Sequence, residues 1–399
     1  MCKSSVFNWN VLAICISLLF LHACATPPQT KTAPPLQLLS HQAFQPSGAA
    51  LETPAQIFFL PAAVIQDVRN QVLRYDRAYD QQLALLRYIF HDEDRDILEY
   101  VNDATLTATE TLQLRVANCL SLTILAASLA EAVGFHVDFQ DVAVPEYWIS
   151  RSGSSMLNGH VNIKLTPSLL TLNSQGLFYQ PESYLIDFDR GSGQIHQRAK
   201  SVSRQTVIAM FYNNKAADAM LLQQYDLAFE YLQAALSLIP AQAEIWNNLA
   251  VLYRKKELLA EAEQSYQYSL QLDPNNNNTL ANLAMLYEKT GRVEQAKELN
   301  QKVVSRRLKN PYYFVMLGNE ALDLGMQQQA LSEFGKALKL QPKTTEAHFG
   351  MAQGYLALGN YQQAKKHLRS AGEYTEDKIL QRRYQTKLGL LHAIARQTK

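Results

Sequence analysis

"WNNLAVLYRKKELLAEAEQSYQYSLQLDP", from Trp246 to Pro274, decides the fold of the second half of this 399-residue chain. It carries apolar residues at helical spacing, and Pro274 ends it because proline cannot continue a helix. The same pattern returns with a period of 34 residues. Five successive units align on one marker position, which is occupied by Tyr212, Trp246, Leu280, Phe314 and His348.

Further positions keep this register. A small residue follows four places after each marker, and alanine follows sixteen places after it: Ala228, Ala262, Ala296, Ala330 and Ala364. Small residues at these places let two antiparallel helices pack closely. Proline closes three units, and other residues stand there in two: Pro240, Pro274 and Pro342 against Leu308 and Glu376. The pattern resembles the tetratricopeptide repeat and predicts an all-α solenoid of five repeats over 205–376, then a capping helix and tail over 377–399.

The resemblance implies a concave face, lined by the first helix of each repeat, that binds a peptide or a protein partner. Helix spacing assigns these residues to it: Asn213, Asn247, Val251, Arg254, Ala281, Met285, Glu288 and Asn319. The amide and guanidinium side chains among them could hold a peptide backbone or a carboxylate: Asn213, Asn247, Arg254 and Asn319. Simple solvation of each side chain is the alternative. The lysine and asparagine set that clamps a C-terminal carboxylate is not matched in register.

Residues 1–23 are predicted to be a lipoprotein signal peptide, because Lys3 precedes an apolar run that is too short to span a bilayer comfortably. "LHAC", which ends at Cys24, resembles the bacterial lipobox. This implies cleavage before Cys24 and acylation of its sulfur, which would anchor the chain to a lipid bilayer. An ordinary signal peptide is the alternative. Ala25 follows, rather than an aspartate, which favours the outer membrane facing the periplasm.

The stretch 24–51 is rich in Pro, Thr, Gln and Ser, and it is predicted to be a flexible tether. The formal net charge of +1 gives no reason to expect nucleic acid as a partner. The sequence contains no glycine-rich phosphate loop, and we expect neither a cofactor nor a metal site.

Residues 52–200 predict an α+β domain. Helical spacing comes first, and one helix is expected to begin at Cys119 and to stop at Gly134. Alternating strand patterns follow in "FHVDFQDVAV", in "HVNIKL" from His160 and in "YLIDFD" from Tyr184, which predicts a small antiparallel sheet. "ISRSGSSMLNG", between the first two, is expected to be a turn or loop.

Cys119 is the one thiol that remains once the signal peptide is removed and Cys24 is acylated. A helix N-terminus favours a thiolate, because its dipole and its N–H groups stabilise negative charge. His160 opens one strand and Asp187 lies in the next, where a histidine and an aspartate can stand side by side. A cysteine helix followed by these two strands resembles the transglutaminase-like superfamily, over roughly 85–200.

This resemblance implies a cysteine acyl-transfer enzyme in which Cys119 is the nucleophile, His160 the base and Asp187 the orienting carboxylate. Asp189 is the alternative to Asp187, and a buried structural thiol is the alternative for Cys119. Transfer to water would make the protein a protease or amidase, which is the favoured outcome, and transfer to an amine a cross-linking enzyme. The competing hypothesis is a non-catalytic repeat scaffold for envelope protein assembly.

Overall fold

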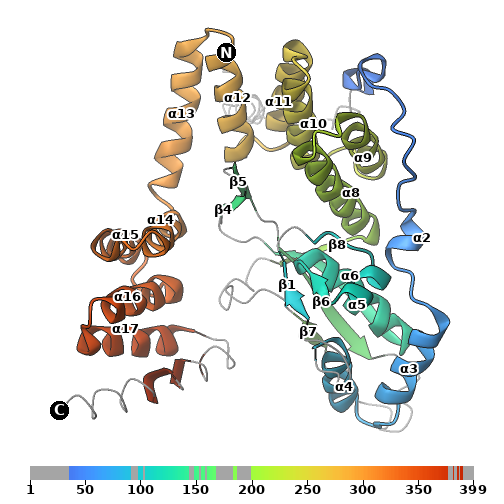
Figure 1. Cartoon of the computed structure of the whole chain (residues 1–399), viewed down its shortest axis with the longest axis vertical. Helices are drawn as coiled ribbons and strands as arrows, with labels where there is room; N and C mark the ends of the chain where they lie inside the picture. Colours follow the sequence, from blue (N-terminus) through green and yellow to red (C-terminus); the bar gives the residue numbers. More distant parts are fainter. Residues whose placement is uncertain are drawn as a thin grey trace, which may run out of the picture. The chain divides into compact units, whose positions relative to one another are not determined.

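The structure is a computed structural model, and it describes an α+β region from Pro54 to Val202 and a run of helices from Arg204 to Tyr374 (Figure 1). The residues described are 36–90, 98–101, 104–142, 148–151, 154–157, 160–167, 183–186, 199–375, 381, 384–385 and 387–389. Residues 1–35, with the predicted signal peptide and Cys24, lie outside them.

Short elements open this part of the chain. The helices are η1 (Leu36–Leu38), η2 (His41–Ala43), α2 (Pro54–Ile57), α3 (Ala62–Val72), α4 (Ala78–Phe90) and α5 (Ala108–Leu114). Two of them, α2 and α5, begin with a capping box, in which the side chains of Thr53 and Thr107 each accept a backbone hydrogen bond from three residues further on. The strands β1 (Glu99–Tyr100) and β2 (Val116–Ala117) pair in parallel.

Helix α6 (Cys119–Ala132) is the central helix of the α+β region. Every residue from Cys119 to Ala130 is buried, so the helix is covered on all sides and not along one stripe only. Gly134 follows with φ 91°, a conformation that glycine adopts at little cost. The predicted helix from Cys119 to Gly134 is therefore confirmed.

Four strands form an antiparallel sheet in the order β7-β6-β3-β8: β3 (Phe135–Val142), β6 (His160–Pro167), β7 (Tyr184–Ile186) and β8 (Ala199–Val202). The register pairs Phe139 with Ile163, and Ile163 with Ile186. All three side chains are buried, and α6 packs against β3 and β6 (Figure 1). The small antiparallel sheet predicted from alternation is confirmed.

The prediction that the whole stretch between the first two strand patterns is a turn or loop is wrong. β4 (Trp148–Arg151) and β5 (Ser154–Leu157) pair there as a hairpin, with Trp148 opposite Leu157 and Ile149 opposite Met156. Large apolar residues on both sides of a short Ser-Gly connection favour strands, and this signal outweighs the serine and glycine content of the stretch.

The helical run consists of antiparallel helix pairs that follow the 34-residue period. Its helices are α8 (Arg204–Leu221), α9 (Tyr225–Leu238), α10 (Ala243–Lys255), α11 (Leu259–Leu272), α12 (Asn277–Lys289), α13 (Val293–Arg307), α14 (Pro311–Asp323), α15 (Gln327–Leu340), α16 (Thr345–Ala357) and α17 (Tyr361–Tyr374). The alanine that recurs in each second helix is at most 1% exposed, from Ala228 to Ala364. The predicted all-α solenoid is confirmed.

The turn between the two helices of each pair is also periodic. One residue takes a positive φ of 60–77° at each of five positions spaced by 34 residues: Gln223, Glu257, Gly291, Gly325 and Gly359. Glycine adopts this left-handed conformation readily, whereas a side chain crowds the following carbonyl. The first two repeats therefore carry strained turns that the last three avoid.

The boundary between the apolar cores does not coincide with the boundary between the α+β region and the repeat array. One core holds the α+β region together with the helices from α8 as far as Ala296 on α13. A second core runs from Phe314 to Met351, and a third joins α16 and α17 to Tyr384. Tyr384 belongs to the predicted capping segment, and its ring lies 5.2 Å from that of Phe349. Most of residues 377–399 lie outside the described residues.

A further departure concerns the stretch 24–51, predicted to be a flexible tether. Residues 38–51 are hydrogen-bonded and packed against α9 and α10, as described below. Only 24–37 therefore remains available as a tether. Its polar composition indicated disorder, but the stretch also carries Phe44, whose buried ring stacks on Phe229, and backbone N–H groups that donate to carboxylates of α9.

Candidate functional site

Cys119 is the first residue of α6 and is 6% exposed. The preceding residue, Asn118, caps the helix: its side chain accepts a hydrogen bond from the Ser121 backbone at 2.9 Å and donates one to Thr105 Oγ1 at 3.1 Å. Ser121 Oγ donates to the Ala104 carbonyl at 2.7 Å. The helix end that carries the thiol is thus held in place by polar contacts with residues 104–105.

The start of strand β6 lies beside this helix end. Thr123 Oγ1 donates to the Val161 carbonyl at 3.0 Å. Thr123 is one helical turn after Cys119 and on the same side of α6, while Val161 directly follows His160. The structure therefore brings the backbone of His160 close to the helix end that carries Cys119. The His160 side chain lies outside what the structure describes.

The third member of the predicted triad lies beyond the described residues. Strand β7 ends at Ile186, and both Asp187 and Asp189 fall outside the residues that the structure describes. The triad and the choice between the two aspartates stay predictions.

Sequence reasoning missed Asn162, which is fully buried two residues after His160. Alternate residues of a strand share a face, so this amide lies on the His160 side of β6. Asn162 shares its face of this alternating strand with the polar residues Lys164 and Thr166, so the sequence pattern alone gave no signal that it is buried.

No metal site is apparent in the described part of the chain, where no group of three or more His, Cys, Asp or Glu could hold an ion. In the same residues, no helix combines the length and apolarity needed to cross a bilayer.

A row of asparagine side chains links the first helices of three repeats. Asn248 Nδ2 donates to Asn213 Oδ1 at 2.9 Å, from α10 to α8. Asn247 Nδ2 donates to Asn248 Oδ1 at 3.2 Å, and Asn282 Nδ2 on α12 donates to Asn247 Oδ1 at 3.0 Å. We call these four residues the asparagine ladder. An amide offers two N–H groups and two lone pairs, so each one keeps hydrogen-bonding capacity beyond the ladder.

The ladder contains two of the predicted groove residues, Asn213 and Asn247, and two that the sequence analysis missed, Asn248 and Asn282. The missed pair could have been found, because the two residues are 34 positions apart and so occupy the same place in successive repeats.

Two further groove residues predicted to hold a peptide, Arg254 and Asn319, are not members of the ladder. Arg254 is half-buried at the end of α10, beside the buried phenol of Tyr266. Burial raises the pKa of Tyr266 to about 12, and the charge of Arg254 opposes that rise. Asn319 is exposed on α14, in the part of the array that has its own core.

Comparison with known proteins identifies the helical run. Models of the tetratricopeptide repeat match residues 243–276, 278–310 and 321–390. No curated protein sequence matches the chain, and the comparisons identify no transglutaminase-like domain.

Solved structures of repeat proteins align with the chain at low identity. PilF of Pseudomonas aeruginosa has 19% identity and a TM-score of 0.26, over 47% of this chain and 91% of PilF. YrrB, described as a repeat protein with an unusual peptide-binding site, has 21% identity and a TM-score of 0.24, over 45% of this chain and 92% of YrrB. A thermophilic repeat protein of Thermus thermophilus has 21% identity and a TM-score of 0.25, over 45% of this chain and 98% of its own length. The C-terminal half of this chain carries tetratricopeptide repeats.

Proposed function

We propose that this protein is an interaction scaffold of the bacterial cell envelope, which holds an extended peptide or protein segment along the asparagine ladder of α8, α10 and α12. The observation that carries the proposal is the ladder itself, four amides that span three repeats. An extended backbone presents alternating N–H and C=O groups, which a row of amides can match without reading the peptide's side chains.

The ladder proposal can be tested with peptides selected on the full-length protein from a random library. We expect the selected peptides to bind the double variant Asn247→Ala, Asn282→Ala at least ten-fold more weakly. Asn319→Ala, an exposed asparagine outside the ladder, is the matched control and should bind as the wild type does. Equal binding by all three proteins would rule the ladder out as the contact surface.

The envelope location rests on the residues that end at Cys24. If Cys24 is acylated, residues 24–37 would be the tether to the membrane, with a reach of at most about 50 Å when fully extended. Metabolic labelling with a fatty acid tests this proposal. Label should enter the wild type and be lost in Cys24→Ala, and label that persists in that variant would contradict it.

A second candidate function is cysteine acyl transfer by the α+β region, of the transglutaminase-like kind. It is supported by the bond between Thr123 and Val161, which holds the Cys119 helix end beside the start of β6. His160 would take the thiol proton, and the thiolate would add to an amide carbonyl. The N–H groups at the start of α6 would stabilise the oxyanion, and the amine would leave as the thioester forms. Water would then release the acid.

The acyl-transfer proposal predicts a thiol whose reactivity depends on a histidine. Alkylation of Cys119 by iodoacetamide should slow at least ten-fold in His160→Ala. His136→Ala, which removes a histidine that is 71% exposed on β3, should leave the rate unchanged. If alkylation is equally slow in all three proteins, Cys119 is a structural thiol and the scaffold function stands alone.

A further inference from the structure

Residues 38–52, which contain the short helix η2 and otherwise no regular secondary structure, form a strap along α8, α9 and α10 (Figure 1). At its start, the Tyr253 hydroxyl of α10 donates to the Leu38 carbonyl at 2.8 Å and accepts from the Ser40 backbone at 3.0 Å. One phenol thus satisfies two backbone groups of the strap.

An aromatic contact holds the centre of the strap. The ring of Phe44 stacks on that of Phe229 of α9, with centroids 4.1 Å apart and planes inclined by 2°. The Lys256 ammonium lies 5.3 Å from the Phe44 centroid. Phe44 is only 8% exposed, although its neighbours in the strap are largely exposed, so this side chain is the anchor.

Two carboxylates of α9 bind the strap by its backbone. The Gln45 N–H donates to Asp226 Oδ1 at 3.2 Å, and the Ser47 N–H donates to Glu230 Oε1 at 2.8 Å. The Ser47 hydroxyl also donates to the Glu230 carboxylate. Two residues of extended chain span about 6.7 Å and four helical residues rise about 6 Å, so alternate N–H groups meet carboxylates one turn apart. Pro46 between them has no N–H to satisfy.

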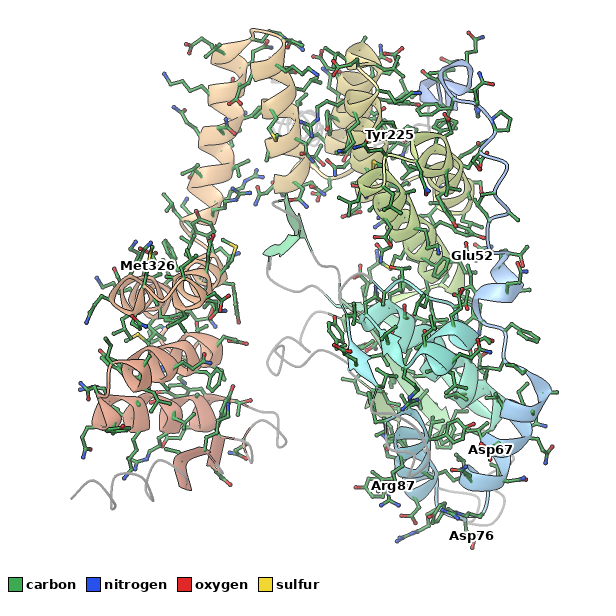
Figure 2. The ribbon with its side chains drawn as sticks, viewed as in Figure 1. Glu52, Asp67, Asp76, Arg87, Tyr225 and Met326 are labelled. Carbon is green, nitrogen blue, oxygen red and sulfur yellow. The ribbon has the colours of Figure 1, made fainter. Side chains whose placement is uncertain are left out.

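Glu52 ends the strap and is held by an ion pair and by hydrogen bonds from two tyrosines, contacts that we call the latch. Glu52 accepts a hydrogen bond from the Tyr231 hydroxyl at 2.8 Å, and its carboxylate lies 2.9 Å from Lys215 Nζ (Figure 2 labels Glu52). The Tyr212 hydroxyl donates to the Glu52 carbonyl at 2.6 Å. Burial by itself would raise the pKa of Glu52, but the hydrogen bonds from Lys215 and Tyr231 outweigh it and lower the pKa. The latch therefore holds a charged carboxylate.

We propose that this face of α8, α9 and α10 is a second peptide-binding site, which the chain fills in cis with its own strap. The site takes an extended segment with an aromatic residue, a hydroxyl three positions later and a carboxylate eight positions later, as in Phe44, Ser47 and Glu52. It is distinct from the asparagine ladder, because Tyr253 lies about 140° around α10 from Asn248.

Covalent connection keeps this site closed to free peptides. A tethered segment competes at an effective concentration on the order of millimolar, so a free peptide of equal affinity gains little occupancy at micromolar concentration. A partner with the same pattern and a better anchor would displace the strap. That exchange would free residues 38–52 and lengthen the chain available ahead of the α+β region.

The test uses the full-length protein and a fluorescent peptide, LLSHQAFQPSGAALET, which copies residues 38–53. The double variant Phe44→Ala, Glu52→Gln weakens the strap but leaves the site intact. We expect it to bind the peptide at least ten-fold more tightly than the wild type does, as measured by fluorescence anisotropy. Gln42→Ala, at an exposed strap position, is the matched control and should behave as the wild type does. A peptide with alanine in place of its phenylalanine should bind none of them.

A second version keeps every strap side chain in place, in case the double variant does not fold. A protease site is inserted between the exposed residues Ala49 and Ala50 and is cut in the folded protein. The labelled peptide should then replace the cut segment. If the peptide binds neither the cut protein nor the folded double variant, the strap is ordinary packing and the proposal is wrong.

Discussion

The α+β region and the repeat array differ in how far apart in the sequence their contacting residues lie. In the array, the helices pack mainly on their neighbours in the sequence, with the packing interrupted between α13 and α14. In the α+β region, Thr123 reaches Val161 across 38 residues, and Phe135 pairs with Pro167 in the sheet. Contacts between neighbouring helices repeat along the chain and so produce a periodic sequence pattern, whereas contacts between residues far apart in the sequence produce none. The array is therefore the part that the sequence describes most completely.

The apolar cores do not follow the division between the α+β region and the repeat array. The core of the α+β region continues through α8 into the third repeat, as far as Ala296, and a separate core begins at Phe314. Packing thus joins the first three repeats to the α+β region, although their sequence pattern groups them with the last two. Substitutions in each part test whether the two cores unfold separately.

The largest effects should come from the two cores. Leu125→Ala in α6 and Phe334→Ala in α15 each remove a fully buried side chain, and each should lower the free energy of unfolding by about 3–5 kcal/mol. Hydrogen exchange should show protection lost from α6 through α12 in the first variant and only from α14 through α17 in the second. Leu114→Ala, at a side chain that is 60% exposed, is the control. Loss of protection along the whole chain in both variants would mean a single cooperative unit.

A smaller effect is expected where glycine makes room for Phe334. A Cβ on Gly318 would lie 2.5 Å from the Phe334 ring, whereas a Cβ on Gly335 would meet nothing within 4 Å. Gly318→Ala should therefore destabilise the array by about 1–3 kcal/mol through overpacking. Gly335→Ala should stabilise it by about 0.5–1 kcal/mol, because alanine favours the helix. Thermal melts of the two variants should shift in opposite directions, and equal shifts would contradict the close packing of Gly318 on Phe334.

Substitutions at the left-handed turn position of the repeats should change the free energy of unfolding by about 1 kcal/mol. Gln223→Gly relieves a left-handed side chain and should raise the free energy of unfolding, while Gly291→Ala introduces one and should lower it. Denaturant titration measures both. If Gln223→Gly is destabilising, the entropy that glycine adds to the unfolded chain outweighs the strain at this turn.

The smallest effect concerns a histidine pair in the last repeat. His348 Nδ1 lies 3.0 Å from His367 Nδ1, and burial lowers the pKa of His367 to about 4, with the charges of His348 and Lys366 adding to that shift. The unfolded chain therefore binds more protons than the folded chain between about pH 6.5 and 4, so stability should fall as the pH drops through that window. The melting temperature of wild type should decline from pH 7 to 5, and His367→Gln should flatten the decline. If the melting temperatures of wild type and His367→Gln change identically with pH, other titratable groups cause the decline.

The two regions also differ in how much of the candidate site could be predicted. In the array, the 34-residue register located Asn213 and Asn247, but the bonds that join them run through Asn248, whose role depends on how neighbouring helices align. In the α+β region, the sequence located the helix that begins at Cys119, because its apolar run and the glycine that follows it are local signals. Its approach to β6 depends on sheet register, which local signals leave open.

The repeat array, its period and buried alanines, and the helix that starts at Cys119 follow from the sequence without any structure, because each of these features repeats or ends within a few turns of chain. The structure was needed to show that residues 38–52 lie on α8, α9 and α10, and that the first three repeats share the core of the α+β region. The physical reason is that the strap contacts join residues about 180 positions apart. The sequence around Phe44 or Glu52 carries no local signal that shows whether a distant residue packs against it.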